Sequence, residues 1–396
     1  MKYNFDTVYD RKNTNSLKYD FAKERGKPED LIPLWVADMD FRTPDEVITA
    51  LKEKAEHGIF GYSEPKSDYY EAIEKWFSTR HGWEVDGRKF VQSCGVVFSI
   101  SALIRTITNV GDAVLICQPV YYPFAETVTE NNRRLIVSEL KNENGYYTVD
   151  YSDFERKIKE NRVKLFILCN PHNPVGRVWT EEELTRLGRI CLENGVFVIS
   201  DEIHCDFTYE GNRHTVFAKL GREFEEHSAI CTAPTKTFNL AGLHISNTYI
   251  YDDELRSRFI KELNAQGYSQ SNVMGLVACQ AAYSYGAEWL DELKAYLAEN
   301  LAFVRNYLKD NIPEIKLVEP QGTYLIWLDC RGLRLTDREL KRLIQNEAKL
   351  WTDGGYIFGA GGSGFERINI ACPRSILKSA MDNLNYAIKS HKKANN

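Results

Sequence analysis

Residues 165–199 read LFILCNPHNPVGRVWTEEELTRLGRICLENGVFVI, two apolar runs on either side of an amphipathic segment. The runs at 165–168 and 196–199 are typical of strands that are buried on both faces. Between them, Thr180 and Glu183 have the spacing of a capping box, which places the start of a helix over 181–193. The stretch therefore predicts a strand, a crossover helix and a second, parallel strand.

The same texture continues on both sides of this stretch. Further apolar runs at 114–117 and 230–231 predict more strands, so we expect an α/β fold with a mostly parallel sheet covered by helices. A long charged helix is predicted over 287–309, followed by strands at 315–318 and 324–328. At 396 residues the chain exceeds what one core usually serves, which favours two domains.

The expected division of the chain has three parts. Residues 1–45 form an N-terminal segment that packs with the small domain, residues 46–285 form the large domain, and residues 286–396 form a smaller C-terminal α+β domain. A glycine-rich match to G-x-G-x-x-G at 359–364 is followed by strand-like alternation. A dinucleotide fingerprint requires a helix at that point, so we interpret 359–364 as a loop that enters a strand.

Composition excludes several classes of protein. Hydrophobic residues make up 43% and charged residues 27%, which are ordinary globular values. The net charge of −6 argues against nucleic acid as the main partner. The sequence shows neither a signal-peptide core nor an apolar run long enough to cross a bilayer, so we expect no membrane partner and a cytoplasmic location.

The nine cysteines are scattered and include no C-x-x-C pair. That spacing fits neither a disulfide framework nor a zinc ribbon, and most of these residues lie inside apolar runs, where a free thiol behaves as a small hydrophobe. Cys205 is set apart because it follows His204 and does not lie inside an apolar run. We expect a packed thiol there, with an oxidation-sensitive thiol as the alternative.

Lys236 lies in the segment TAPTKTFN (232–239), where hydroxyl residues and a proline surround a single amine. A buried lysine in such a setting is a candidate for Schiff-base formation with an aldehyde. Asp201 and Asn173 each follow a predicted parallel strand, and ligands in open α/β sheets bind at those strand ends. An amine, an acid for a ring nitrogen and a donor for a phenolic oxygen are what pyridoxal phosphate needs.

A phosphate cradle is expected at Gly95, Val96 and Val97, because a glycine that opens a helix leaves backbone amides free for an anion. Thr235 adds a hydroxyl beside the lysine, and Tyr121 can lay a flat ring over the cofactor. Each motif also has an ordinary structural explanation. A tyrosine between prolines is more often a packing residue, and an Asn-Pro pair is often only a turn.

Six segments occur in an order that resembles one family. They are WVADMDF (35–41), GVV (95–97), PVYYPF (119–124), PHNPVGRVW (171–179), DEIH (201–204) and KTFNLAGL (236–243). Over nearly its whole length the chain resembles fold-type I pyridoxal phosphate enzymes of the class-II aminotransferase-like group. Within it, WVADMDF and DEIH resemble the cystathionine β-lyase branch, which includes the maltose-regulon modulator type.

This resemblance implies roles for individual residues. It implies that Lys236 holds the cofactor aldehyde, that Asp201 pairs with the pyridine nitrogen and that Asn173 binds the phenolic oxygen. Tyr121, which would stack on the ring, is with Lys236 an expected catalytic residue, and His204 would pack beside the cofactor.

The resemblance also implies two contacts beyond the cofactor ring. Arg367 would grip the substrate carboxylate, as a planar bidentate donor can. Tyr62 would reach the phosphate of a neighbouring subunit, which implies a homodimer with shared active sites.

The chain departs from the family pattern at several positions. Ala233 stands where serine is common, and His244 where an arginine is common, so the phosphate would rely more on Thr235 and the amides of 95–97. Cys94 replaces a usual proline, and Cys205 a usual small residue. A metal site formed by Asp201, Glu202, His204, Cys205 and Asp206 is the less favoured alternative, because consecutive side chains at a strand end diverge.

Three functions stay open at this point. The first is a carbon–sulfur β-lyase that cleaves cystathionine, cysteine or related S-substituted amino acids into pyruvate, ammonia and a thiol. The second is an aminotransferase, which would use the same residues. The third is a cofactor-binding regulatory protein that sequesters a transcription factor, as the resemblance to the maltose-regulon modulator type allows.

Overall fold

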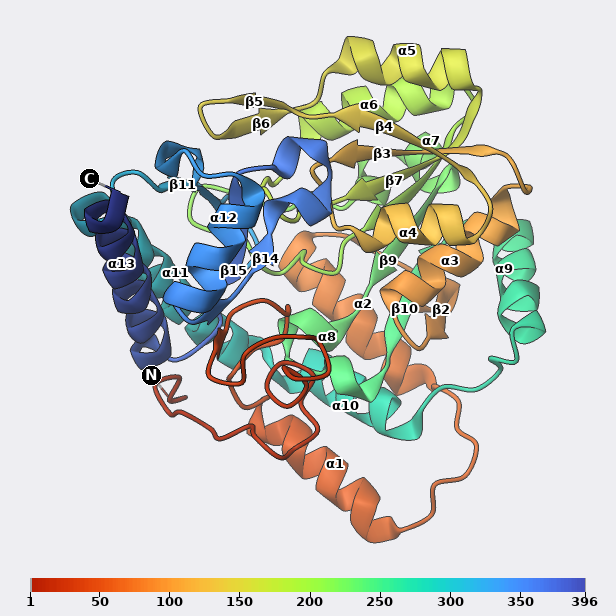
Figure 1. Ribbon diagram of the computed structural model, residues 1–396. Helices are drawn as coiled ribbons and strands as arrows, with labels where there is room; N and C mark the ends of the chain where they lie inside the picture. The colour runs from red at the N-terminus through yellow and green to blue at the C-terminus, as the bar shows by residue number, and fades with distance from the viewer. Residues whose placement is uncertain (1, 396) are drawn as a thin grey trace.

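A seven-stranded sheet forms the centre of the computed structural model, which describes residues 2–395 (Figure 1). Its strands lie in the order β2-β10-β9-β8-β7-β3-β4. Their bounds are β2 Phe90–Ser93, β3 Ala113–Gln118, β4 Arg134–Glu139, β7 Val163–Cys169, β8 Phe197–Asp201, β9 Ser228–Thr232 and β10 Ser246–Ile250. Strands β4, β3, β7, β8 and β9 pair in parallel, and β10 is antiparallel to both of its neighbours. The predicted mostly parallel sheet is therefore confirmed.

The helices of the described chain cover both faces of this sheet and continue into the C-terminal part. Their bounds are α1 Asp45–His57, α2 Ser67–His81, α3 Val96–Ile107, α4 Pro123–Glu130, α5 Tyr151–Asn161, α6 Glu181–Glu193, α7 Arg222–Glu226, α8 Pro234–Thr237, α9 Asp253–Ala265, α10 Val273–Tyr285, α11 Ala287–Asn311, α12 Asp337–Arg342 and α13 Arg374–Asn395. The crossover helix α6 has the bounds that its sequence predicts, and Thr180 and Glu183 form the capping box.

The strands read as continuous apolar runs because alternate side chains enter two different cores. In β3, Val114 and Ile116 pack with α3, α4 and α9, whereas Leu115 faces the core that contains α2, α5 and α6. The neighbouring strand β7 repeats this alternation with Ile167 and Phe166. Since successive side chains of a strand point to opposite faces, a sheet covered on both sides needs apolar residues at every position.

The C-terminal part builds a second sheet beside the first (Figure 1). This sheet has the order β11-β12-β15-β14, with bounds β11 Lys316–Val318, β12 Leu325–Asp329, β14 Asp353–Gly354 and β15 Phe365–Asn369. Helices α11, α12 and α13 lie around it (Figure 1). A small two-stranded hairpin is formed by β5 Lys141–Glu143 and β6 Tyr146–Thr148. The expected α/β fold with a further α+β part is thus observed.

The N-terminal segment runs as coil along the C-terminal part before α1 begins. Its two-residue strand β1 Ile32–Pro33 pairs in parallel with β13 Leu350–Trp351. Trp35 stacks on Trp351 with ring centroids 4.5 Å apart. These contacts carry the following residues, 36–41, toward the large sheet.

The glycine-rich stretch at 359–364 enters β15 through a short 3-10 turn at Ala360–Gly362, so it opens no helix of the kind that a dinucleotide fingerprint needs.

All nine cysteines are unpaired. Eight are buried, including Cys205, and the partly exposed thiol is Cys94. Among residues 2–395, none of the helices combines the length and apolar character that crossing a membrane requires.

Candidate active site

A cavity of about 490 Å³ opens where β7, β8 and β9 end, and nine of the residues predicted from the sequence line it. They are Gly95, Val96, Val97, Tyr121, Asn173, Asp201, His204, Thr235 and Lys236. The parallel strands explain this convergence, because their carboxyl ends meet at one edge of the sheet. Asn173 follows β7, Asp201 ends β8, and Lys236 follows β9.

Lys236 lies on the four-residue helix α8 and is half-buried. Its Nζ donates a hydrogen bond to the backbone oxygen of Ala37, 2.7 Å away. Burial lowers the pKa of Lys236 to about 8, against the opposing attraction of Asp38 and Asp201. A lysine amine with such a pKa has a substantial neutral fraction near neutral pH, which nucleophilic attack on an aldehyde and proton abstraction both require.

Asp201 is 5% exposed and accepts one hydrogen bond from protein, from the backbone N–H of Ile203 at 3.1 Å. Burial raises its pKa to about 7, and Glu202 adds to the effect. An ionised carboxylate can accept about four hydrogen bonds, so most of its acceptor capacity remains for a group inside the cavity. A protonated ring nitrogen is the kind of donor that such an acid would stabilise.

His204 packs its ring against Tyr324, with centroids 5.6 Å apart and the planes inclined by 68°. Burial, together with the positive charges of Lys236 and Arg367, lowers the pKa of His204 to about 3, so its imidazole is neutral. Its Nδ1 is buried without a hydrogen-bond partner. A neutral ring with one unsatisfied nitrogen is suited to contact a flat aromatic ligand.

The start of α3 faces the cavity with an open helix terminus. Gly95 is its N-cap, and no side chain caps the first amides. A Cβ atom built on Gly95 would meet nothing within 4 Å, so the backbone here borders open space. Because Val96, Val97 and Thr235 line the same cavity, the terminus and one hydroxyl are available to an anion.

Arg367 lies beside this cavity on β15 and is buried. Its Nη1 donates to Asn173 Oδ1 at 3.0 Å, and its Nη2 donates to the backbone oxygen of Trp35 at 3.1 Å. The same Nη2 pairs with Asp353, which stands directly opposite Arg367 in the β14–β15 register. The Nε of Arg367 is buried without a partner, which leaves donor capacity for a carboxylate.

Tyr121 and Tyr62 differ in where they lie. Burial raises the pKa of Tyr121 to about 12, so its phenol stays protonated at the edge of the cavity. Tyr62, in the segment between α1 and α2, is 94% exposed and does not line the cavity. Within this chain, Tyr62 is therefore the one residue predicted for the site that the fold does not bring near Lys236.

Sequence reasoning missed two participants in this region. The backbone oxygen of Ala37 accepts a hydrogen bond from Lys236, and Asp353 neutralises Arg367. Both contacts join segments that are separated in the sequence, and no local pattern records them. His244, which stands where an arginine is common in the family, lines the cavity.

The residues present fit pyridoxal phosphate on structural grounds. Three groups face one cavity. They are an amine with a lowered pKa, a buried acid with free acceptor capacity and an uncapped helix terminus. Asn173 Oδ1 is engaged by Arg367, which leaves its amide nitrogen as the donor for a phenolic oxygen. The donor set thus matches the aldehyde, ring nitrogen, phosphate and phenolic oxygen of that cofactor.

Comparison with known proteins supports the same assignment. Residues 29–384 match the family model described as aminotransferase class I and II. The chain belongs to this family. The chain is 41% identical over 385 residues to cystathionine beta-lyase PatB of Bacillus subtilis (strain 168), which covers 97% of this chain and 100% of that protein.

Solved structures are similar over the whole chain as well. Cystalysin from Treponema denticola, whose crystal structure contains a pyridoxal 5'-phosphate cofactor, has a TM-score of 0.95 and 37% identity, covering 99% of this chain and 100% of that one. The pyridoxal phosphate-bound C–S lyase from Staphylococcus hominis has a TM-score of 0.91 and 35% identity, with 98% of each chain covered. The fold-type I architecture expected from the sequence is therefore confirmed.

Proposed function

We propose that this protein is a pyridoxal phosphate-dependent carbon–sulfur β-lyase that cleaves S-substituted amino acids of the cystathionine or cysteine type. The arrangement of Lys236, Asp201 and Arg367 around one cavity is the observation that carries the proposal. The full-length similarity to proteins named cystathionine beta-lyase and C–S lyase supports elimination as the reaction. The products would be pyruvate, ammonia and a thiol.

Each part of the cofactor has a residue to hold it. Lys236 would hold the aldehyde, Asp201 the ring nitrogen, and Asn173 the phenolic oxygen. The phosphate would lie at the amides of 95–97 with Thr235, while Tyr121 and His204 would flank the ring. When bound, pyridoxal phosphate supplies an electron sink for the pair of electrons left on the substrate Cα.

The chain's own residues would handle the proton and the substrate carboxylate. Arg367 would orient the substrate by its α-carboxylate, using the donor capacity that Asn173, Trp35 and Asp353 leave free. The substrate amine would first displace Lys236 from the cofactor aldehyde. The freed Lys236 Nζ would then take the Cα proton, a role that its pKa of about 8 suits near neutral pH. The Cβ–S electrons then leave with sulfur, which becomes the thiol after protonation. Water hydrolyses the released three-carbon fragment to pyruvate and ammonia.

The test is product formation without a keto acid. Purified protein loaded with pyridoxal phosphate and given L-cystathionine should release pyruvate, ammonia and a thiol in equal amounts. The Lys236→Ala variant is the control and should show neither the absorbance of the lysine-bound cofactor nor turnover, since the amine that takes the proton is gone. Wild-type activity in that variant would refute the assignment of Lys236.

Transamination is the outcome that would overturn elimination. Lys236, Asp201 and Arg367 would serve both reactions, because the first proton transfer is shared. An aminotransferase would form no thiol and would require an added keto acid for turnover. Absence of both activities in cofactor-loaded protein would instead leave a regulatory binding role.

We also propose a homodimer with shared active sites. The segment between α1 and α2 exposes three large side chains, with Ile59 67%, Phe60 59% and Tyr62 94% exposed. Such a cluster on a projecting segment supports contact with a second copy. Tyr62 would then reach the phosphate held by the neighbouring subunit.

Hybrid dimers test this contact sharply. Subunits carrying Tyr62→Ala, mixed with subunits carrying Lys236→Ala, would form one intact site per hybrid if Tyr62 acts across the interface. Activity should therefore rise above that of either variant alone. If Tyr62 acts within its own chain or not at all, mixing yields no gain beyond the average of the two.

A cytoplasmic location is part of the same proposal. The nine cysteines are all unpaired, and eight of them are buried. Unpaired cysteines in this number are typical of a reducing compartment.

A further inference from the structure

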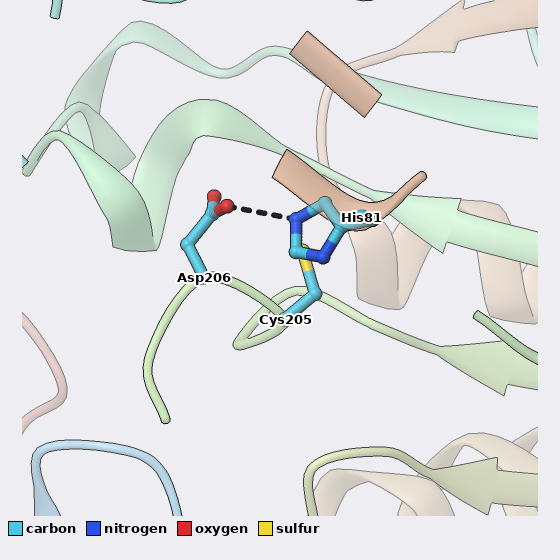
Figure 2. A group of neighbouring side chains, drawn as sticks. All are labelled: His81, Cys205 and Asp206. Atoms are coloured by element: carbon cyan, nitrogen blue, oxygen red, sulfur yellow. Dashed lines mark hydrogen bonds and ion pairs between the residues drawn. The ribbon is translucent and has the colours of Figure 1, made fainter. Parts of the chain in front are cut away.

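A buried carboxylate lies directly behind the active site, outside the cavity. Asp206 is five residues beyond Asp201 and is 5% exposed. Figure 2 shows its carboxylate pointing at the ring of His81, with Cys205 beside them. This group serves none of the functions described above.

Three side-chain donors converge on Asp206. Its Oδ1 accepts from Trp76 Nε1 at 3.1 Å and from His81 Nε2 at 2.9 Å, both on α2. Its Oδ2 accepts from Thr237 Oγ1 at 2.7 Å. Burial opposes ionisation, yet the hydrogen bonds from His81 and Thr237 hold the pKa of Asp206 below its usual value. Asp206 is thus a charged acceptor, which makes these bonds stronger than neutral ones.

Thr237 is the residue next to Lys236 on α8. This helix has only four residues, and two backbone bonds close its C-terminal end, from Phe238 N to Pro234 O and from Leu240 N to Thr235 O. So short a helix cannot fix its own position, because one turn costs more conformational entropy than its hydrogen bonds return. Contacts with other segments must therefore decide where Lys236 lies.

Two side-chain anchors of this kind hold the segment. Asn239 donates through Nδ2 to the backbone oxygens of Met39 and Phe41 at 3.0 and 2.9 Å. Thr237 donates to Asp206, which lies five residues after Asp201. The second anchor links the strand end that carries the acid to the helix that carries the amine.

We propose that Asp206 is a positioning residue, which fixes Lys236 relative to Asp201 through the hydroxyl of Thr237. The proposal rests on the assignment of Lys236 as the amine that binds the cofactor. A displacement of about 1 Å at a reacting group can cost about 100-fold in rate, so the anchor bears directly on proton transfer.

A metal site is the competing explanation of this cluster. One ligand atom each from His81, Cys205 and Asp206 lies within 4.8 Å of the others. The carboxylate, however, already accepts three hydrogen bonds, and burial raises the pKa of Cys205 well above its usual value. A thiol that resists ionisation is a poor ligand, since metals bind the thiolate.

The decisive variant is Thr237→Val, which keeps the side-chain shape and removes the hydroxyl. We expect kcat to fall by about 10- to 100-fold with KM changed by less than about threefold, because the substrate contacts at Arg367 are untouched. Thr237→Ser should restore most of kcat. Thr106→Val is the matched control, since it removes another buried hydroxyl bond, from Thr106 to Ala102 at 2.8 Å, at the far end of α3.

Hydrogen exchange of the cofactor-free protein gives a readout that does not depend on activity. Backbone amides of 235–240 should exchange faster in Thr237→Val and in Asp206→Asn, whereas amides of α6 should not change. This readout separates the positioning role of Asp206 from the proposed lyase activity. The expected change in exchange rate does not depend on whether the wild-type protein is a lyase. Wild-type exchange and kcat in Thr237→Val would overturn the positioning role, and so would a stoichiometric metal ion in purified protein that Cys205→Ala removes.

Discussion

Asp201 and Asp206 lie five residues apart and are equally buried, yet their pKa values are shifted in opposite directions. Asp201 receives one backbone N–H and lines the cavity, and burial raises its pKa to about 7. Asp206 receives three side-chain donors, and its pKa is lowered despite the burial. The number of donors, and not the depth of burial, therefore separates the two carboxylates.

This difference indicates why one of the two carboxylates can bind a ligand and the other cannot. A carboxylate whose acceptors are all satisfied by protein stabilises the scaffold, whereas one with free acceptors can take a donor from a ligand. Asp201 is the under-satisfied group, at the strand end where ligands bind in such sheets. Exchanging one carboxylate at a time for its amide should show the two roles separately.

The largest expected effect is on turnover. Asp201→Asn should lower kcat by about 100- to 1,000-fold, since the acid that stabilises charge on the cofactor ring is lost. Asp206→Asn should lower it by about 10- to 100-fold, because the geometry of Lys236 loosens. The rate of pyruvate release at saturating cofactor measures both, and equal losses would remove the distinction between the two acids.

The two substitutions should change the stability of the cofactor-free protein in opposite directions. Asp206→Asn should destabilise it by about 2–4 kcal/mol, because donors from His81 and Thr237 lose a charged acceptor. Asp201→Asn should stabilise it by about 1–3 kcal/mol near pH 8, because a buried charge with one donor is removed. Urea unfolding at one protein concentration tests this, and destabilisation by both variants would contradict the comparison.

The pH dependence gives a further distinction. The folded state holds a proton on Asp201 between the ordinary pKa of 3.8 and about 7, whereas the unfolded chain has released it. The contribution of Asp201 to the free energy of unfolding therefore falls as the pH rises from 3.8 to about 7. Thermal unfolding of cofactor-free wild-type and Asp201→Asn protein, from about pH 5 to about pH 8, should show a difference in Tm that grows with pH. A constant difference would mean that Asp201 is ionised throughout.

The smallest effect is expected at Cys205. Its thiol is buried beside Asp206, and burial raises its pKa, so Cys205→Ala should change kcat by less than about twofold. Burial also raises the pKa of Cys94, but this thiol is the partly exposed one. A thiol reagent should therefore modify Cys94 first. Rapid labelling of Cys205 in folded protein would contradict the packed-thiol interpretation.

Sequence reasoning reached much of the site because strand ends in a parallel sheet converge. Once β7, β8 and β9 were recognised as apolar runs, Asn173, Asp201 and Lys236 followed as residues at or just beyond the ends of neighbouring strands. The start of α6 could also be predicted from the local sequence, because a capping box marks it. These features depend on residues that are close together in the sequence.

Contacts between distant segments escaped prediction. Lys236 meets Ala37 across 199 positions, and Asp206 meets His81 across 125. The pairing of Arg367 with Asp353 depends on the register of two short strands. No local periodicity encodes such meetings, because they arise when the sheets and the N-terminal segment pack. The role of Tyr62 is a prediction that a second subunit must test.

The most direct test of the account is chemical identification of the cofactor-bearing residue. Protein incubated with pyridoxal phosphate, reduced with borohydride and digested should yield one peptide with the pyridoxyl group attached to Lys236. The same treatment of Lys236→Ala should leave that peptide unmodified. A label on a different lysine in active wild-type protein, with Lys236 unmodified, would contradict the central claim.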